Sequence, residues 1–473
     1  MAAYVPTPAP ASTAGVPPGP GLAPYDPLFD PLVSRTGHGQ DYAPTYWVAS
    51  AGAPPPDDGP VRGDIDVDVA VIGSGFTGLS TALALARDHG VQAVVLEANR
   101  AAWGCTSRNG GQGQNASGRL YRSQWIARWG LDTARRLDAE IREGFEYWKS
   151  LVASIECDAQ PGGHLYTAHR GKKLAFLENE ARIMRELFGY DARMLSREEL
   201  HARYTADREA AGALLEPDGI GVHPLKLAYG YLRQARALGA RVHTASPVQG
   251  WETVGGVHQL RTPGGVVRAR RVAVATGGYT PQGLHPALSG RIMPILSNSM
   301  VTRVLTPAER EAAGLRSTVF ITDTRTLRFY YRLLPDGRMQ IGSRSAVTGA
   351  DARHPRHLRL LQEGLARKFP ALRDVKIDYS WWGWVDVSHD MMPRIARPDP
   401  GQHIYYACGY GGNGVSFSAA AGRRMAQRIV GQAGAQWDLP IYDSPLPGHA
   451  FAPFRRIGQA LLYKWYYLRD EVI

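Results

Sequence analysis

Three glycines and one carboxylate are the residues of this chain whose spacing most plainly predicts chemistry. Gly73, Gly75 and Gly78 follow the pattern GxGxxG, and Glu97 lies about 20 residues further on. Glycines at this spacing permit a tight turn, let a pyrophosphate approach the backbone and allow a helix to pack closely on a strand. An acid at Glu97 can hold both ribose hydroxyls of an adenine dinucleotide. The pattern therefore predicts a site for FAD or NAD, and the carboxylate argues against the 2′-phosphate of NADP.

The elements that must position these residues are also present in the sequence. The apolar run from Val67 to Ile72 predicts a buried strand, and the Ala/Leu-rich stretch after Gly78 predicts a helix. A second apolar run, from Val94 to Leu96, predicts a strand that ends at Glu97. The helix would turn its free N–H groups toward a bound phosphate.

Two further glycine-rich segments suggest close contact with a ligand. Residues 106–112, TSRNGGQ, combine small backbone with amide groups and have no helical or strand periodicity, which suits packing against a flat polar ring. Residues 409–418, GYGGNGVSFS, lie between an apolar strand pattern and a helical pattern. We expect this second strand-to-helix turn to bind an anion or a carbonyl group.

Size and composition limit the classes of protein that fit. A chain of 473 residues exceeds what one hydrophobic core usually serves, so we expect two domains. No run of 18 or more uncharged apolar residues predicts a membrane span, and no secretion signal is expected at the N-terminus. The net charge is +11, but single arginines are scattered among acids, which argues against a role in nucleic-acid binding.

The cysteines predict a cytoplasmic protein without a metal site. Cys105, Cys157 and Cys408 lie far apart and lack metal-ligand spacing, and an odd number argues against a disulfide framework. The Pro/Ala-rich first residues, to about residue 24, predict disorder. Aromatic residues return between Tyr25 and Ser50, and we expect that part of the arm to follow a fixed path over the body.

The stretch from Arg291 to Tyr379 changes to a β-rich pattern with alternating side chains. Its middle strand contains Tyr330 and Tyr331, which must point to opposite faces, so one of them is expected to face the ligand. Trp382 and Trp384 follow in an aromatic cluster that favours core packing, with contact to substrate as the alternative. The last stretch, FRRIGQALLYKWYYLRDEVI, predicts an amphipathic helix that packs on the body, with weak contact to a membrane surface as the alternative.

Taken together, the motifs resemble the D-amino-acid-oxidase-like flavoproteins. GSGFTGL with Glu97, the TSRNGGQ loop, a helix beginning at VHP, VATGG, WGW followed by HDMMPRIA, and GYGGNGVSFS occur in the order of that family. The RNGGQ loop and the GNGVSFS turn look most like the gamma-glutamylputrescine oxidoreductase branch. The resemblance covers roughly residues 64–431.

The resemblance implies an α/β fold with an α+β second domain. It consists of a Rossmann-like FAD-binding domain of the glutathione-reductase type and a mainly antiparallel β-sheet substrate domain. The expected FAD-binding parts are residues 61–154, 206–287 and 381–445, and the substrate domain comprises residues 155–205 and 288–380. Residues 1–60 form an N-terminal arm and residues 446–473 a C-terminal amphipathic helix.

The resemblance also implies which residues contact FAD. The phosphates and adenosine would lie against the first glycine-rich turn, the end of the second strand and the backbone of Val248, whereas the flavin would lie against the loop and the last turn. Ser416 stands where sarcosine-oxidase relatives carry a lysine, and the cysteine that carries their flavin is missing, so non-covalent FAD is expected. The expected FAD-binding residues are Gly73, Ser74, Gly75, Phe76, Thr77, Gly78, Glu97, Ala98, Asn99, Thr106, Ser107, Asn109, Gly110, Gly111, Gln112, Val248, Thr276, Gly277, Gly411, Gly412, Asn413, Gly414 and Val415.

In such a family the flavin performs the redox chemistry. A neutral amine or amino acid gives hydride from its α-carbon to flavin N5, water hydrolyses the imine, and O₂ reoxidises the flavin to give peroxide; a gamma-glutamylated diamine is one candidate substrate. The expected catalytic residues are Tyr331, Asn413 and His223, with Tyr330, Trp382 and Trp384 at the substrate. A dehydrogenase that uses a quinone or another acceptor is one alternative, and a non-catalytic dinucleotide-binding module is another. The sequence indicates no oligomeric state.

Overall fold

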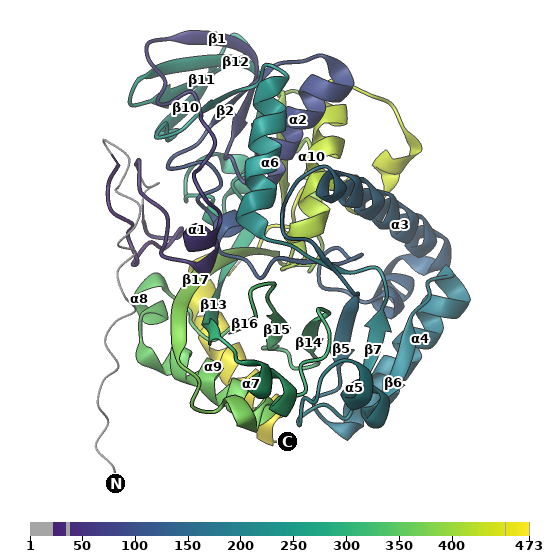
Figure 1. Cartoon of the computed structure of the whole chain (residues 1–473). Coiled ribbons are helices and arrows are strands. Elements are labelled where there is room, and N and C mark those ends of the chain that lie inside the picture. The colour runs from purple at the N-terminus through teal and green to yellow at the C-terminus, as the bar shows by residue number, and fades with distance from the viewer. Residues whose placement is uncertain (1–21, 35–37, 450, 473) are drawn as a thin grey trace.

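The computed structural model describes residues 22–34, 38–449 and 451–472, and two large sheets organise them (Figure 1). The first sheet has the strand order β10-β11-β12-β1-β2-β9, and β19 joins it through β12 and is followed by β18. The pairings of β1 with β12 and β2, of β2 with β9 and of β12 with β19 are parallel, as in a dinucleotide-binding fold. Its strands are β1 (Ile65–Ile72), β2 (Ala93–Leu96), β9 (Arg241–His243), β10 (Gly250–Val254), β11 (Val257–Thr262), β12 (Gly265–Val274), β18 (Arg394–Ala396) and β19 (Ile404–Cys408).

Three helices pack side by side on one face of the first sheet (Figure 1). The middle one, α2 (Phe76–His89), lies between α6 (Pro224–Ala237) and α10 (Gly414–Ile429). The hydroxyl of Ser80 on α2 donates to the carbonyl of Ser418 on α10 at 3.1 Å, and the small residues of both helices allow this close approach. The long helix α3 (Arg122–Ala153) crosses beside α10. The first hydrophobic core lies between these helices and the sheet.

The second sheet is mainly antiparallel and has the order β17-β13-β16-β15-β14-β5-β7-β6. Only the pairing of β14 with β5 is parallel. A separate three-stranded sheet, β3-β8-β4, lies among the described residues as well. The strands of both are β3 (Gln112–Gly113), β4 (Gln160–Pro161), β5 (His164–Thr167), β6 (Arg193–Ser196), β7 (Gly212–Glu216), β8 (Ile220–Gly221), β13 (Ile292–Val304), β14 (Phe320–Asp323), β15 (Tyr330–Leu333), β16 (Arg338–Ser343) and β17 (Ile377–Ser388).

One face of the second sheet carries a core of its own. Leu165, Ile321, Tyr331 and Ile341 point into this core, which α9 (Pro355–Lys368) covers. The remaining helices are short or peripheral. They are α1 (Tyr46–Ser50), α4 (Leu174–Phe188), α5 (Arg197–Arg203), α7 (Pro307–Ala312), α8 (Gly349–Ala352), α11 (Arg455–Tyr467) and the turns η1 (Cys105–Ser107), η2 (Gly171–Lys173), η3 (Gly277–Tyr279), η4 (Pro286–Leu288), η5 (Pro370–Leu372), η6 (Ala435–Asp438), η7 (Ala452–Phe454) and η8 (Leu468–Val472).

The combination of a parallel and a mainly antiparallel sheet confirms the expected fold class, but two domain boundaries need correction. The strand β7 belongs to the second sheet, although the sequence assigned residues 206–287 to the first domain. The strand β17 runs past residue 380 and stays paired with β13 as far as Ser388. Both strands are placed by pairing with distant partners, which local periodicity does not reveal.

The N-terminal arm is part of the core rather than a surface layer. Trp47 is 1% exposed, and Tyr42 and Phe29 are also buried. Tyr42 donates its hydroxyl hydrogen to the carbonyl of Ala101 at 2.6 Å, and Trp384 donates its indole hydrogen to that of Phe29 at 3.0 Å. The described part of the arm thus follows a fixed path, whereas the disorder expected for residues 1–24 falls almost entirely outside the described residues.

The chain ends on the second sheet. Arg456 of α11 pairs with Asp30 of the arm at 2.7 Å, and Glu471 pairs with Arg325 at 2.5 Å. None of the helices in the described residues combines the length and the apolar character needed to cross a membrane.

Candidate active site

A cavity of about 340 Å³ joins the two sheets. It begins where the parallel strands of the first sheet end, at Ile72, Leu96 and Ala275. It continues to the face of the second sheet opposite its core, where His164 and Tyr330 line it. Ligands of open parallel sheets bind at this edge, so the cavity is the candidate active site.

The turn at the start of α2 requires two of its glycines. Gly73 has φ +100°, and a Cβ there would lie 2.9 Å from the carbonyl oxygen of Ala275. A Cβ on Gly78 would lie 1.8 Å from the carbonyl oxygen of Gly73, inside the strand-to-helix contact. Neither site has room for a side chain, so the tight turn requires glycine at both positions. The turn directs the N-terminus of α2 toward the cavity, which Gly75, Phe76 and Thr77 line.

Glu97 lies at the end of β2 and lines the same end of the cavity. Its carboxylate accepts hydrogen bonds from the backbone N–H of Ser74 at 2.9 Å, from the Ser74 hydroxyl at 2.6 Å and from the backbone N–H of Asn99 at 3.0 Å. Burial raises the pKa of Glu97, although these donors oppose the shift. The bonds fix the carboxylate at the point where a ribose is expected.

The loop of residues 106–112 forms the next part of the wall. Trp47 donates to the carbonyl of Asn109 at 2.8 Å, and Trp381 donates to the carbonyl of Arg108 at 2.8 Å, so two buried indoles hold the loop. Gly110 and Gln112 line the cavity, and the amide nitrogen of Gln112 has no partner among the described residues. A buried donor without a partner beside a cavity fits a polar ring that accepts a hydrogen bond.

The N-terminus of α10 completes this half of the site. Gly412, Gly414 and Val415 line the cavity, with Asn413 as the cap residue. The amide of Asn413 donates to the carbonyl of Gly118 at 2.6 Å, which ties the turn to the neighbouring loop. The free N–H groups and the dipole of α10 favour negative charge at this point.

The second sheet contributes a polar wall. His164, Tyr166, Thr322 and Glu216 alternate along β5, β14 and β7 with residues that point into the opposite core. The Nδ1 atom of His164 lies 2.5 Å from the Glu216 carboxylate, and its Nε2 lies 2.7 Å from the Thr322 hydroxyl. Burial raises the pKa of Glu216, but the bond and charge of His164 outweigh it, so that its pKa is lowered overall.

Three arginines converge on the cavity between the α10 turn and this wall. Arg119, Arg328 and Arg344 line it, and none forms an ion pair with a carboxylate among the described residues. Arg119 and Arg344 donate to the carbonyl of Gly411 at 3.2 and 3.3 Å. Burial lowers the pKa of Arg119 and of Arg344, and neighbouring arginines lower both further. Cations that are buried without an anion fit a site for an anionic ligand group.

A carboxylate without a full set of partners lies on the same cavity. Glu180 of α4 is 3% exposed, and one of its oxygens has no hydrogen bond among the described residues. Burial raises its pKa. We call the part of the cavity that these arginines and acidic residues line the chamber. The chamber thus combines groups that attract an anion with groups that attract a cation.

Comparison with known proteins identifies this architecture. The profile described as FAD dependent oxidoreductase (DAO) matches residues 68–428. The chain belongs to this family. The family is enzymatic, so the alternative of a non-catalytic dinucleotide-binding module is not retained. Gamma-glutamylputrescine oxidoreductase of Escherichia coli (strain K12) is 36% identical over 448 residues, which cover 91% of this chain and 99% of that protein.

More distant members agree with the assignment to this family. Glycine oxidase of Bacillus licheniformis is 26% identical over 378 residues, which cover 77% of this chain and 93% of that protein. The crystal structure of glycine oxidase from Geobacillus kaustophilus superposes with a TM-score of 0.66 at 20% identity and covers 81% of this chain and 99% of that one. The last comparison establishes the fold only. The chain is therefore an FAD-dependent oxidoreductase of this family.

The cavity fits FAD held without a covalent bond. Of the three cysteines, only Cys105 lines it, and burial raises the pKa of that thiol to about 12. A thiol that stays protonated is a poor nucleophile. All three cysteines are free, and no group of acidic, histidine and cysteine side chains suited to a metal ion occurs in the described residues.

Most of the residues expected at FAD line the cavity, and four do not. Ser74 holds Glu97, Gly78 packs on Gly73, Ser107 donates to the carbonyl of Trp103, and Gly111 packs against Val222. These four position the residues that face the cavity. The ones that line it are Gly73, Gly75, Phe76, Thr77, Glu97, Ala98, Asn99, Thr106, Asn109, Gly110, Gln112, Val248, Thr276, Gly277, Gly411, Gly412, Asn413, Gly414 and Val415.

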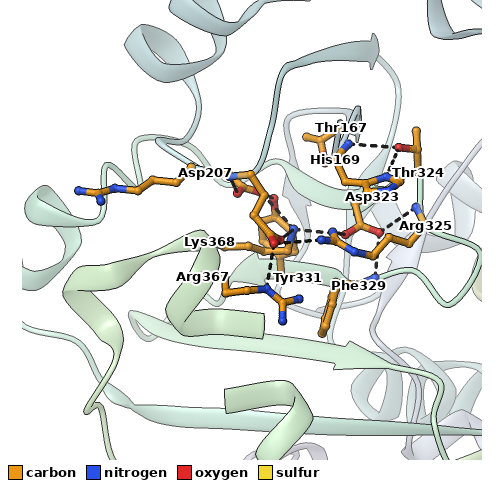
Figure 2. Close-up of polar contacts among 12 residues, drawn as sticks. Thr167, His169, Asp207, Asp323, Thr324, Arg325, Phe329, Tyr331, Arg367 and Lys368 are labelled. Atoms are coloured by element: carbon orange, nitrogen blue, oxygen red, sulfur yellow. Dashed lines mark hydrogen bonds and ion pairs between the residues drawn. The ribbon is translucent and has the colours of Figure 1, made fainter. Parts of the chain in front are cut away.

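Tyr331 is not in the cavity, which corrects its expected catalytic role. It points into the opposite core, and its hydroxyl donates to Asp207 in a buried ionic cluster (Figure 2). Lys368 Nζ lies 3.3 Å from Asp207 and 3.2 Å from Asp323, and Arg325 lies 2.5 Å from Asp323. The cluster ties β14 and β15 to the end of α9. Tyr331 therefore has a structural role, and Tyr330 is the one of the two tyrosines that lines the cavity.

His223, Trp382 and Trp384 are also absent from the cavity wall. His223 caps α6 by accepting from the backbone N–H of Lys226 at 3.2 Å, and burial lowers its pKa to about 3. Trp384 is 1% exposed and packs on the arm. Trp382 alternates away from Gly383, which lines the cavity. Sequence reasoning had no signal that separated these residues from ligand contacts, because burial and aromatic clustering are common to both.

Seven chamber residues were not predicted from the sequence. They come from loop positions (Arg119, Tyr121 and Arg328), from α4 (Glu180) and from the strands β5 and β7 (His164, Tyr166 and Glu216), and no motif marks them. The unpredicted residues are Arg119, Tyr121, His164, Tyr166, Glu180, Glu216 and Arg328.

Proposed function

We propose that this enzyme oxidises an amine whose other end carries an amino acid group, a gamma-glutamylated diamine, and that O₂ accepts the electrons. The observation that supports this substrate is that arginines without an ion pair and acidic side chains line the same cavity. Arg119 and Arg344 suit a carboxylate, and Glu180 and Glu216 suit an ammonium group.

Simpler amines leave part of the chamber without a partner. A plain diamine has no carboxylate for the arginines. A small amino acid has no second amino group for Glu180 and Glu216 once its own amine is the group that reacts. Buried polar groups that stay unpaired cost binding energy, so each of these substrates is expected to bind more weakly. The 36% identical relative acts, by its name, on gamma-glutamylputrescine, which has both ends.

The chamber also favours the reactive form of the amine. Bound FAD supplies a hydride acceptor. Hydride loss requires the neutral amine, and burial lowers the pKa of a bound amine. The chain therefore promotes loss of the amine proton without a dedicated base at His223. The backbone N–H groups of Gly412 to Val415 would stabilise negative charge on the ring.

A second candidate is a dehydrogenase that transfers electrons to a quinone. The observation in its favour is the exposed apolar face of the C-terminal helix, which is described below. Peroxide formation during aerobic turnover distinguishes the two. The three free cysteines are in keeping with the reducing cytoplasm that we expect as the location.

The test is anaerobic bleaching of the purified holoenzyme by a series of amines. Gamma-glutamylputrescine, putrescine, glycine and sarcosine are compared under identical conditions. The gamma-glutamylated diamine is expected to bleach the flavin with the highest rate constant per concentration, at least about 100-fold above putrescine, which corresponds to two charged hydrogen bonds. Equal rate constants of flavin bleaching for putrescine and gamma-glutamylputrescine would refute the proposal that the chamber binds the glutamyl end of the substrate.

A further inference from the structure

The C-terminal helical segment carries an apolar stripe on its outer face. Of the large apolar side chains that are exposed among the described residues, more than half lie between residues 451 and 472. Those on the stripe are spaced 3, 4, 4, 3 and 4 residues apart, which places them on one side of a helix. The apolar stripe consists of Phe454, Ile457, Leu461, Trp465, Leu468 and Val472, which are 41–66% exposed.

The opposite face of the same segment is bound to the body. Arg456 pairs with Asp30 at 2.7 Å, and Gln459 is 1% exposed and donates to the Tyr463 hydroxyl at 3.0 Å. Asp470 accepts from the backbone N–H of Thr326 at 2.6 Å, and Glu471 pairs with Arg325 at 2.5 Å. The orientation of the helix is therefore fixed, and the exposed fractions of its apolar side chains show that the stripe faces solvent. Figure 1 shows this segment in yellow, leading to the C-terminus.

Cations flank the apolar stripe and acids do not. In a helical projection, Lys464 lies on one side of the stripe, and Arg455 and Arg469 lie on the other. Lys464 is exposed, and the side chain of Arg469 is 42% exposed and pairs with the buried Asp470 at 3.3 Å. The residues of α11 include no acid, and Asp470 and Glu471 are engaged with the body. An apolar stripe with a Trp and basic borders is the pattern of a helix that lies in a membrane interface.

We propose that this segment docks the enzyme on an anionic membrane surface, with the apolar stripe among the acyl chains and the cations at the lipid headgroups. A second copy of the chain fits less well, because two stripes packed together would bring Arg455 and Lys464 of both copies into proximity, and neither cation has an acid to pair with among the described residues. The net charge of +11 adds a long-range attraction to anionic lipid. This docking extends beyond the proposed reaction and does not depend on its substrate.

The test is co-sedimentation of the FAD-loaded enzyme with vesicles. Vesicles of phosphatidylcholine with 30% phosphatidylglycerol are compared with vesicles of phosphatidylcholine alone. The wild-type enzyme is expected to bind the anionic vesicles at least about 10-fold more strongly and to lose most of this binding in 0.5 M salt, at which charge attraction is screened.

Variants separate the apolar stripe from the rest of the surface. The triple variant Ile457→Ser, Leu461→Ser and Trp465→Ser is expected to bind anionic vesicles at least about 10-fold more weakly, with unchanged flavin absorbance and melting temperature. Val254→Ser, on the β10–β11 hairpin, removes an equally exposed apolar side chain and is the matched control. Its vesicle binding is expected to equal that of the wild type.

The opposite outcomes overturn the proposal. If the wild-type enzyme fails to bind anionic vesicles, the apolar stripe has another partner. Light scattering that shows a wild-type dimer and a monomeric triple variant would assign the stripe to a second copy of the chain. Amine oxidation is measured separately, so that failure of the proposed substrate leaves this result intact.

Discussion

The indole N–H of Trp47 donates to the carbonyl oxygen of Asn109 at 2.8 Å and thereby attaches the N-terminal arm to the loop of residues 106–112. Trp47→Phe keeps most of the buried ring but leaves that carbonyl without its donor. We expect the free energy of FAD binding to become less favourable by about 1–2 kcal/mol, because the loop is no longer held. This corresponds to FAD binding that is weaker by about 5–30-fold. Titration of the apoenzyme with FAD measures the change.

Trp437→Phe is the matched control for that variant. Trp437 makes the same kind of bond, to the carbonyl of Gln432 at 2.8 Å, but at the surface and away from the cavity. Its FAD affinity is expected to match the wild type. Equal FAD affinity in both variants would show that the arm has no part in holding the loop.

Arg344→Gln removes one of the unpaired cations of the chamber. For a gamma-glutamylated diamine we expect kcat/KM to fall by about 10–100-fold, the value of a charged hydrogen bond, with most of the change in KM. For putrescine, which has no carboxylate, kcat/KM is expected to change by less than about 2-fold. Steady-state kinetics with both substrates give the comparison, and Arg373→Gln, at an exposed arginine, is the control. A similar loss with both amines would argue against carboxylate binding by Arg344.

Tyr330 and Tyr331 are expected to respond in opposite ways. Tyr331→Phe loses the bond to buried Asp207 and should lower the free energy of unfolding by about 1–2 kcal/mol without a change in kcat. Tyr330→Phe should lower kcat/KM by about 10-fold, because its hydroxyl lies at the chamber wall beside Ser297 and Ser299. Denaturant unfolding and turnover are measured on both variants. A large loss of kcat in stable Tyr331→Phe would restore Tyr331 as a catalytic residue.

His223 makes stability depend on pH. Burial lowers its pKa to about 3, so the folded chain keeps it neutral while the unfolded chain takes up a proton near pH 6.5. The unfolded state then binds more protons, and stability falls as the pH drops from about 6.5 toward 3. Between pH 7.5 and 5.5 the expected loss from this residue is about 1.4 kcal/mol.

His223→Asn retains a helix cap and removes this titration. When the pH is lowered from 7.5 to 5.5, the wild type is expected to lose about 1.4 kcal/mol more unfolding free energy than the variant, so the difference between the two narrows by that amount. Denaturant titrations at the two pH values provide the measurement. A constant difference would mean that His223 titrates alike in both states.

The FAD half of the site could be predicted from the sequence because its determinants are local. Gly73, Gly78 and Glu97 belong to one strand-turn-helix-strand unit, in which spacing alone places each residue. The same holds for the turn before α10. Of the four predicted residues that do not line the cavity, Ser74 and Gly78 lie in the first turn and Ser107 and Gly111 in the loop of residues 106–112. Only the direction of each residue was missed.

The substrate half could not be predicted, because it arises from tertiary packing. Alternation along β15 places Tyr330 and Tyr331 on opposite faces but does not say which face is covered by α9. Arg119 lies in a loop and Glu180 on α4, and their approach depends on how β5 and β7 pair across more than forty residues. Local pattern carries no information on such pairing.

The interleaving of the two sheets along the chain has a consequence for biosynthesis. The wall of the FAD cavity takes residues from the first strand, from Ala275 after β12 and from Gly412 before α10, with segments of the second sheet between them. A ribosome must therefore release most of the polypeptide before the coenzyme can be captured, and neither sheet can be expressed as a separate unit with a complete cradle. Until then, the nascent chain must keep its early strands from aggregating.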